Sequence, residues 1–324
     1  MASGIVEFSA KKYRKWMDVL DDIFDTLDLK GALYFRTDFS SPWAVTVPPL
    51  GQAARFHLVV QGNCHVTFPS GAAARLGPGD LVLIPGGSSH ILADGPGRAA
   101  PDLETVLQDA GYDGRGVLAI GNGNPHAATQ MICGHFNFRP RADHPLLRAL
   151  PEYLTVSAGD RMAEPFLDEL LRLIARRIYG GELGSRAAVT RLSEIVYIEL
   201  LRSGVLKNPT LTALLSAFRD PKIGRALELI HEKPGDAWTV DQLAREVGMS
   251  RSRFSERFSD LIGVGPVSYL SDWRLQKALG LLEDRRTPVQ QIATMIGYQS
   301  AAAFTRAFAG KFGMSPTEYR RIPV

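Results

Sequence analysis

The sequence predicts an α+β protein with two domains, an N-terminal β-barrel and a C-terminal all-α domain that contains two helix–turn–helix units. Three observations support this prediction. The chain has 324 residues, more than a single domain usually holds. Short apolar runs separated by turn residues occupy residues 31–140, whereas helical periodicity begins at about Pro145. The predicted boundaries place the barrel domain at 1–155, a helical coupling region at 156–208 and the second domain at 220–324.

Composition excludes several classes of protein. Hydrophobic residues make up 45% and charged residues 22% of the chain, which excludes disorder over its whole length. No apolar run approaches the ~20 residues of a membrane-spanning helix, so no membrane partner is expected. The first residues lack the apolar core of a signal peptide. Two cysteines, Cys64 and Cys133, cannot build a disulfide framework, so we expect a reducing cytoplasm.

The net charge of +3 is unevenly distributed. Residues 1–219 contain 22 basic and 22 acidic side chains, whereas residues 220–324 contain 15 basic and 12 acidic ones. The positive excess therefore lies in the last third of the chain, which weakly favours a nucleic-acid partner there.

The β-barrel is predicted from short apolar runs at 43–47, 56–60, 65–68 and 81–84, each followed by Gly, Pro or Asn. The coupling region is predicted from two amphipathic segments, 165–179 and 185–203. Each segment has one apolar face, which either packs on the barrel or forms a contact between two copies of the chain.

The last third of the chain contains an internal repeat. Five residues recur 50 positions apart: Phe254 and Phe304, Phe258 and Phe308, Gly263 and Gly313, Pro266 and Pro316, Tyr269 and Tyr319. Each repeat is predicted to form two helices joined by a tight turn, at Gly248 and at Gly297. The first helix of each repeat is predicted to begin with a capping box, Thr239 with Gln242 and Thr287 with Gln290.

The second helix of each repeat buries its phenylalanines and leaves polar side chains outside. Two such helices about one DNA turn apart, roughly 34 Å, can enter successive major grooves. A predicted helix over 268–283 would hold them at a fixed separation. The alternative is that the repeats are ordinary hairpins of a helical bundle, but the matched positions of the repeat favour DNA binding.

The segment 220–321 resembles the DNA-binding domain of AraC/XylS-type transcription regulators, most closely over 292–320. The resemblance implies that one domain reads two consecutive major grooves of promoter DNA and that the protein contacts RNA polymerase. By position, base-facing or adjacent residues would be Ser252, Ser255 and Glu256 in the first unit, and Ser300, Ala301, Ala302, Thr305 and Arg306 in the second. Arg251, Arg253, Arg257 and Lys311 would contact phosphates. For Glu256 the alternative is a surface salt bridge to Arg253 or Arg257.

Residues 79–90 match the second cupin motif, with Gly79, Pro85, Gly87 and His90 at its fixed positions. The His-x-His pair and the glutamate that usually complete a cupin metal site are absent. Residues 30–155 resemble the cupin-type sensor halves of one AraC subfamily, so the barrel is expected to be cupin-like and to sense an effector. The same resemblance favours 156–208 as a dimerisation element of a homodimer.

Four residues are candidates for the metal or effector site of this barrel: His57, His90, Cys133 and His135. They could ligate zinc or another divalent metal. Two alternatives are an organic effector bound without metal, and a thiol redox sensor that uses Cys64 or Cys133.

Catalysis is not expected, because the ligand set of cupin oxygenases is absent and the chain ends in a DNA-binding domain. The sequence thus predicts a cytoplasmic, sequence-specific transcription regulator whose cupin-like domain senses a small molecule, metal or redox signal. A nonspecific architectural DNA binder and a cupin that only binds ligand or catalyses a reaction are the alternatives.

Overall fold

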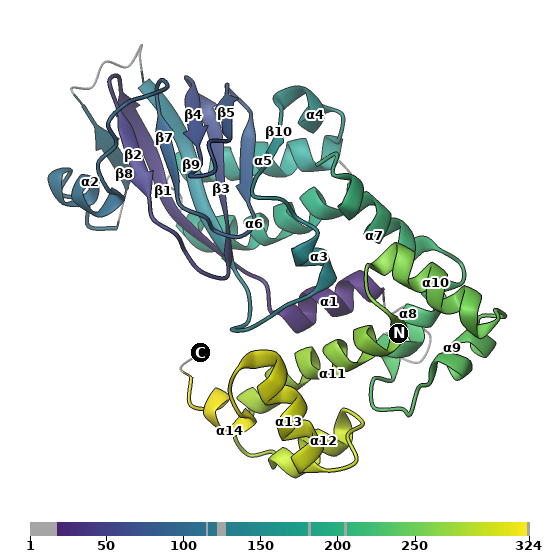
Figure 1. Cartoon of the computed structure of the whole chain (residues 1–324). Helices are drawn as coiled ribbons and strands as arrows, with labels where there is room; N and C mark the ends of the chain where they lie inside the picture. The colour runs from purple at the N-terminus through teal and green to yellow at the C-terminus, as the bar shows by residue number, and fades with distance from the viewer. Residues whose placement is uncertain (1–17, 115, 122–127, 181–182, 204–205, 323–324) are drawn as a thin grey trace, which may run out of the picture. The chain divides into compact units, whose positions relative to one another are not determined.

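The computed structural model describes residues 18–114, 116–121, 128–180, 183–203 and 206–322. These residues form two compact units, which we call the β unit and the helical unit (Figure 1). The β unit comprises residues 28–140 and 144–212, and the helical unit comprises residues 18–27, 141–143 and 213–322 in its described part.

The β unit contains two sheets with their inner faces around one apolar core. The larger sheet has the strand order β10-β6-β3-β9-β1-β8 and the smaller has the order β2-β7-β4-β5. The strands are β1 (Lys30–Ser40), β2 (Ala44–Val47), β3 (Ala53–Gln61), β4 (Cys64–Thr67), β5 (Ala73–Leu76), β6 (Leu81–Ile84), β7 (His90–Ala93), β8 (Val117–Ile120), β9 (Ala128–Asn137) and β10 (Leu154–Val156). The predicted fold class is confirmed, with two hydrogen-bonded sheets in place of one closed barrel.

The core of the β unit takes its side chains from both sheets. Val59, Val82 and Met131 come from the larger sheet, and Val66 and Leu92 from the smaller. Strand β3 is buried continuously over 53–59 instead of alternating, because its other face is covered as well.

The helices of the β unit are α2 (Leu103–Asp109), α3 (Pro145–Arg148), α4 (Ala158–Met162), α5 (Pro165–Gly180) and α6 (Ser185–Arg202). Helices α5 and α6 match the two amphipathic segments of the sequence. They cover the outer face of the larger sheet (Figure 1), where the Tyr197 ring lies 4.7 Å from the Phe136 ring. The predicted coupling region is therefore part of the β unit, because its leucines are buried on that unit.

The helical unit contains α1 (Val19–Leu27), the greater part of α7 (Pro209–Arg219), α8 (Ile223–Glu232), α9 (Val240–Glu246), α10 (Arg251–Ile262), α11 (Pro266–Glu283), α12 (Val289–Met295), α13 (Ala301–Phe312) and α14 (Pro316–Tyr319). No helix in the described part of the chain is long and apolar enough to cross a membrane.

Residues 1–155 were predicted to belong to the barrel domain, but helix α1 lies in the helical unit. Val19, Ile23 and Leu27 recur at intervals of four residues and are buried on one face of α1, which contacts α8 and α11. The chain therefore contributes to the helical unit before it forms the β unit.

A buried polar cluster joins α1 to α8 and α11. Nδ1 of His231 lies 2.9 Å from a carboxylate oxygen of Asp22, and its Nε2 lies 2.8 Å from the Tyr269 hydroxyl. Nζ of Lys277 donates to the second Asp22 oxygen at 2.5 Å. Burial lowers the pKa of His231 although the Asp22 hydrogen bond opposes the shift, so His231 is neutral at pH 7. Its Nδ1–H then donates to Asp22, and the Tyr269 hydroxyl donates to Nε2.

The two repeats are helix–turn–helix units with phenylalanine cores. Phe254 and Phe258 of α10, and Phe304 and Phe308 of α13, are completely buried. The capping box of Thr239 with Gln242 is confirmed at the start of α9. The corresponding prediction for the second unit is wrong, because Pro288 occupies the N-cap and Gln290 Oε1 instead accepts from the Ala301 amide at 3.3 Å.

The turn glycines of the two units have unequal surroundings. Gly248 and Gly297 both adopt left-handed conformations, with φ of 62° and 82°. A Cβ at Gly248 would have no heavy atom within 4 Å, whereas one at Gly297 would lie 2.5 Å from the Gly235 carbonyl oxygen and 2.7 Å from the Arg274 guanidinium.

We expect Gly297→Ala to destabilise the helical unit more than Gly248→Ala. Gly248→Ala should cost only the left-handed backbone penalty of about 1–2 kcal/mol. Gly297→Ala should add about 1–3 kcal/mol, because the new methyl group displaces backbone. Amide hydrogen exchange of α9 and α12 measures both effects, and equal losses would contradict the steric argument.

Candidate functional site

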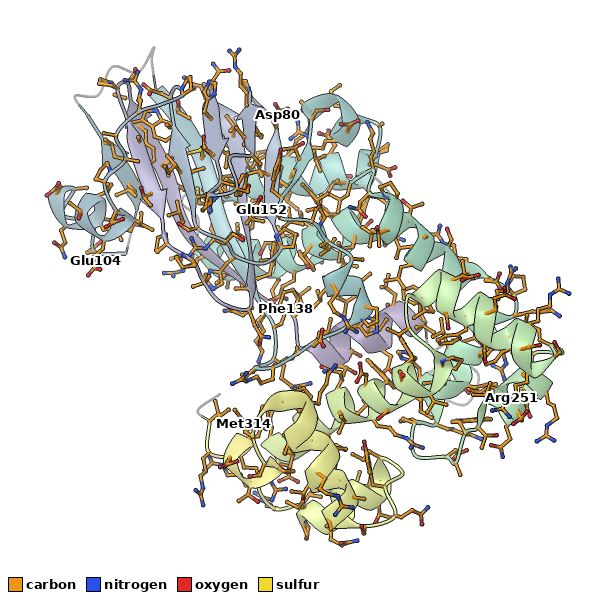
Figure 2. All side chains as sticks on the ribbon, in the orientation of Figure 1. Asp80, Glu104, Phe138, Glu152, Arg251 and Met314 are labelled. Carbon is orange, nitrogen blue, oxygen red and sulfur yellow. The ribbon has the colours of Figure 1, made fainter. Side chains whose placement is uncertain are left out.

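The first candidate DNA-contacting surface is the outer face of α10. Arg251, Ser252, Arg253 and Glu256 are exposed there, and Ser255 is half-buried. Arg251 marks the start of α10 in Figure 2. The helix begins after Ser250 and ends at Gly263, whose φ of 82° supplies the left-handed C-cap.

Two of the α10 arginines are held by carboxylates and one is not. Arg257 pairs with Asp220, and Arg251 pairs with Asp241 at 3.1 Å. Within the described residues, Arg253 and Glu256 have no ion-pair partner. The predicted alternative for Glu256, a salt bridge to Arg253 or Arg257, is therefore not formed, and its carboxylate remains open to solvent.

The second candidate surface is the outer face of α13. Ala302 and Arg306 are exposed, while Ala301 and Thr305 are half-buried. Ser300 is the N-cap of this helix, and its hydroxyl accepts from the Ala303 amide at 3.2 Å, so it has a structural task as well. In the described part of the chain, no carboxylate pairs with Arg306.

Lys311 does not lie free for phosphate contact. Its ammonium is 2.9 Å from an Asp143 oxygen and 3.0 Å from an Asp272 oxygen. Burial acts to lower its pKa, but these two carboxylates raise it above the ordinary lysine value. The Asp272 pair joins α13 to α11 and the Asp143 pair joins α13 to the segment 141–143, so Lys311 is not a phosphate candidate.

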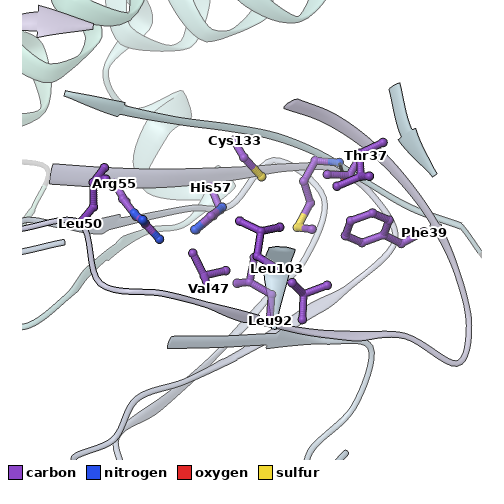
Figure 3. A pocket seen from close by; sticks show the side chains of 12 residues that line it. Thr37, Phe39, Val47, Leu50, Arg55, His57, Leu92, Leu103 and Cys133 are labelled. Carbon is purple, nitrogen blue, oxygen red and sulfur yellow. Dashed lines mark hydrogen bonds between the residues drawn. The ribbon is translucent and has the colours of Figure 1, made fainter. Parts of the chain in front are cut away.

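The β unit contains a pocket of about 130 Å³ between its two sheets (Figure 3). Its lining is mainly apolar: Thr37, Phe39, Val45, Val47, Leu50, Arg55, His57, Leu92, Leu103, Leu118, Met131 and Cys133. Antiparallel pairing places His57 opposite Cys133 and Val59 opposite Met131, so β3 and β9 direct matching side chains to the same face.

Two of the four residues predicted for the effector site, His57 and Cys133, line this pocket, and His90 adjoins it. The Nε2 atoms of His57 and His90 are 2.8 Å apart, and Nδ1 of His90 lies 2.8 Å from the Ser88 carbonyl oxygen. His135 pairs in register with Arg55, and its Nε2 lies 3.0 Å from the Asn137 amide nitrogen. The fourth candidate is therefore oriented by contacts of its own, outside the pocket lining.

The histidines of this region are uncharged at neutral pH. Burial, His90 and the charge of Arg55 hold the pKa of His57 well below its ordinary value. Burial lowers the pKa of His90 to about 4, and burial together with Arg55 lowers that of His135 to about 4.

These residues do not fit a metal site. Zinc requires three or four protein ligands in a common geometry. Within the residues that the structure describes, no group of three or more His, Cys, Asp or Glu side chains is placed to hold an ion. The two nearest candidates, His57 and His90, hydrogen-bond to each other instead.

The two thiols are buried and protonated. Burial raises the pKa of Cys64 to about 12 and raises that of Cys133 further above the ordinary thiol value. Because the thiolate is the species that oxidants attack, neither cysteine has the environment of a reactive redox sensor.

Arg55 is a further residue of this pocket, and it was not predicted from the sequence. Arg55 is two residues before His57 on the same strand and is only 4% exposed. Side chains two residues apart in a strand point to the same face, so the prediction for His57 could have included Arg55. However, a lone arginine in a strand usually faces solvent. Only the burial of β3 on both faces places its guanidinium inside.

Comparisons with known proteins agree with these observations. A cupin domain profile matches residues 18–205, and a helix-turn-helix domain profile matches residues 243–322. The HTH-type transcriptional regulator AlkR of Acinetobacter baylyi is 30% identical over 94% of this chain and 99% of its own length. The chain belongs to the AraC family of DNA-binding transcription regulators.

Another family relative is an HTH-type transcriptional regulator of Haemophilus influenzae, 30% identical over 94% of this chain and 99% of its own length. The solved DNA-binding domain of AdpA, in complex with a target DNA, is 32% identical over 31% of this chain and 90% of its own, with a TM-score of 0.30. The C-terminal domain of AraT, a response regulator from Geobacillus stearothermophilus, is 28% identical over 32% of this chain and 85% of its own, with a TM-score of 0.31.

Proposed function

We propose that the helical unit recognises promoter DNA in a sequence-specific manner, with α10 and α13 entering successive major grooves. The observation that carries this proposal is the pair of matched helix–turn–helix units, whose second helices each expose an arginine, Arg253 on α10 and Arg306 on α13. Arg306 can donate to guanine O6 and N7, and Glu256 can accept from cytosine N4. Ser252, Ser255, Ala301, Ala302 and Thr305 would contact neighbouring base edges or sugars, while Arg253 and the ion-paired Arg251 and Arg257 would contact phosphates.

Selection of binding sites from random DNA, followed by footprinting of the best site, tests this proposal. We expect two protected segments whose centres are about one helical turn, 10–10.5 base pairs, apart. A protein that selects no sequence would be a nonspecific architectural binder. A single protected segment would mean that only one of the two units enters a groove.

We further propose that the β unit senses a small organic molecule and that the protein contacts RNA polymerase in the cytoplasm. The apolar pocket supports an organic effector, because such pockets bind ligands by burying apolar surface. Neither the histidine arrangement nor the buried thiols supports metal or redox sensing. Genomic binding sites are mapped first, and transcription is then assayed with the substrates and products of the enzymes that the neighbouring genes encode. This experiment tests both the response to an effector and the action on RNA polymerase.

The third proposal is that the chain forms a homodimer through the outer surfaces of α5 and α6. Most apolar side chains of these helices are buried on the sheet, but Phe166 is 54% and Ile195 is 39% exposed. Large exposed apolar side chains are frequent at interfaces.

We expect Phe166→Ser combined with Ile195→Ser to raise the dimer dissociation constant at least about tenfold, because two apolar contacts are lost. Sedimentation equilibrium at micromolar concentration measures this change. Val117→Ser is the matched control, since Val117 is 42% exposed on β8. A wild-type chain that stays monomeric with and without DNA would contradict the dimer.

A further inference from the structure

The pocket of the β unit has chemically different ends. In Figure 3, Arg55 and His57 lie toward one end, and Phe39 and Thr37 lie toward the other. Between them the walls consist of apolar side chains from both sheets, including Val47, Leu92 and Met131. A ligand that fills this space meets apolar surface along most of its length, and Arg55 and His57 at one end.

Arg55 supplies a fixed positive charge to the polar end. Its side chain is only 4% exposed, and a guanidinium stays protonated under all conditions in which proteins fold. Arg55 is the one charged side chain among the twelve that line the pocket. In surroundings of low polarizability a buried charge acts strongly on a nearby ion, so this end attracts an anion.

The histidines around Arg55 add no further charge. Burial together with the guanidinium charge disfavours the protonated forms of His57 and His135. Nδ1 of His90 donates to the Ser88 carbonyl oxygen, so Nε2 of the neutral His90 accepts from Nε2–H of His57. Nδ1 of His57 is therefore unprotonated; it is buried without a hydrogen-bond partner among the described residues and can accept from a ligand hydroxyl but cannot donate to an anion. The single cation Arg55 suits a monoanion better than a dianion, whose second charge would be buried without compensation.

We propose that this pocket binds a small amphipathic carboxylate, with its carboxylate at Arg55 and its apolar part directed toward Phe39. This inference rests on the proposed sensing function and names the chemical class of the effector. The planar guanidinium fork matches the two oxygens of a carboxylate, and its five N–H donors allow it to serve a ligand in addition to protein groups.

The volume of the pocket limits the size of the apolar part. An apolar cavity of about 150 Å³ binds benzene in another protein. A pocket of about 130 Å³ therefore accommodates a chain of roughly six carbons or one aromatic ring without rearrangement. Hexanoate meets both the size and the charge requirement, and it has isosteres that differ only in the polar end.

The test uses the full-length protein and three probes: hexanoate, 1-hexanol and 1-hexylamine. Calorimetric titration should show that hexanoate binds roughly 10- to 100-fold more tightly than hexanol, and that hexylamine binds weakest. Arg55→Met keeps the volume and removes the charge, so it should abolish the preference of hexanoate over hexanol. Arg75→Met, the same change at an exposed position of β5, should leave that preference intact.

Each outcome decides the inference. Equal affinity for hexanoate and hexanol, or no binding of hexanoate by the wild-type protein, would overturn it. The comparison of the three probes on the wild-type protein stands even if Arg55→Met fails to fold, and Arg55→Lys then tests the charge without the planar guanidinium.

A parallel measurement of DNA affinity separates this inference from the proposed sensing function. Arg55-dependent hexanoate binding without any effect on DNA affinity supports the ligand class and contradicts sensing. An effect of hexanol equal to that of hexanoate supports sensing and contradicts the ligand class.

Discussion

Replacement of Asp22 by alanine is expected to destabilise the helical unit by about 3–5 kcal/mol, because two hydrogen bonds to a buried carboxylate are lost, each worth about 1.5–3 kcal/mol. Asp22 is 7% exposed and accepts from both His231 and Lys277. Its loss would leave the Lys277 ammonium and the buried His231 N–H without their carboxylate. Amide hydrogen exchange followed peptide by peptide measures the change, because it separates α8 and α11 from the β unit.

The matched control is Asp25→Ala on the same helix. Asp25 is exposed, so its replacement should change the stability by less than about 0.5 kcal/mol. Equal effects of the two variants would show that α1 contributes through its apolar face alone and that the buried cluster is not stabilising.

The same cluster makes the stability of the helical unit depend on pH. Burial acts to raise the pKa of Asp22, but the hydrogen bonds from His231 and Lys277 lower it below the ordinary value of 3.8. Burial lowers the pKa of His231 below 6.5. Both groups therefore bind protons more readily in the unfolded chain, so stability is highest above pH 6.5 and falls as the pH is lowered. The first loss, below pH 6.5, should come from His231 and be absent in His231→Gln, and the second, below pH 3.8, should come from Asp22.

Replacement of Arg306 by alanine should weaken binding to the selected operator by about 1–3 kcal/mol and relax the sequence preference at one base pair. Arg306 is exposed near the middle of the α13 outer face and has no ion-pair partner among the described residues. Its guanidinium can therefore reach a guanine without breaking a contact within the protein. Competition titrations against operators mutated at single positions measure both effects.

Two further variants separate base contact from general attraction to DNA. Arg253→Ala should weaken binding to all sequences about equally and reduce the salt slope by about one, as expected for a phosphate contact. Arg225→Ala should leave DNA affinity unchanged, since Arg225 lies on α8, outside the helix–turn–helix units. An unchanged footprint and affinity in Arg306→Ala would falsify the base contact assigned to Arg306.

Local sequence patterns predicted the two helix–turn–helix units because their signals are short-range. The phenylalanine spacing, the turn glycines and the capping box of Thr239 with Gln242 each act within one or two helical turns. The failure at Thr287 has a local cause as well, since Pro288 takes the N-cap and leaves Gln290 free to contact the next helix.

The pocket of the β unit was only partly predictable. Four residues were predicted to form the site, and two of them, His57 and Cys133, line the pocket because β3 and β9 pair in register. Sequence reasoning could not determine that Arg55 is buried or that His57 hydrogen-bonds to His90, because these contacts join strands 33 or more residues apart.

The sequence by itself determined the two kinds of domain and the positions of the recognition helices, since hydrophobic periodicity and turn residues act locally. Only the tertiary structure decided that α1 completes the helical unit, that Lys311 is an internal ion-pair partner and that Gly297 is more crowded than Gly248. These features arise from packing between segments distant in sequence, where the burial of a side chain depends on what the rest of the chain places against it.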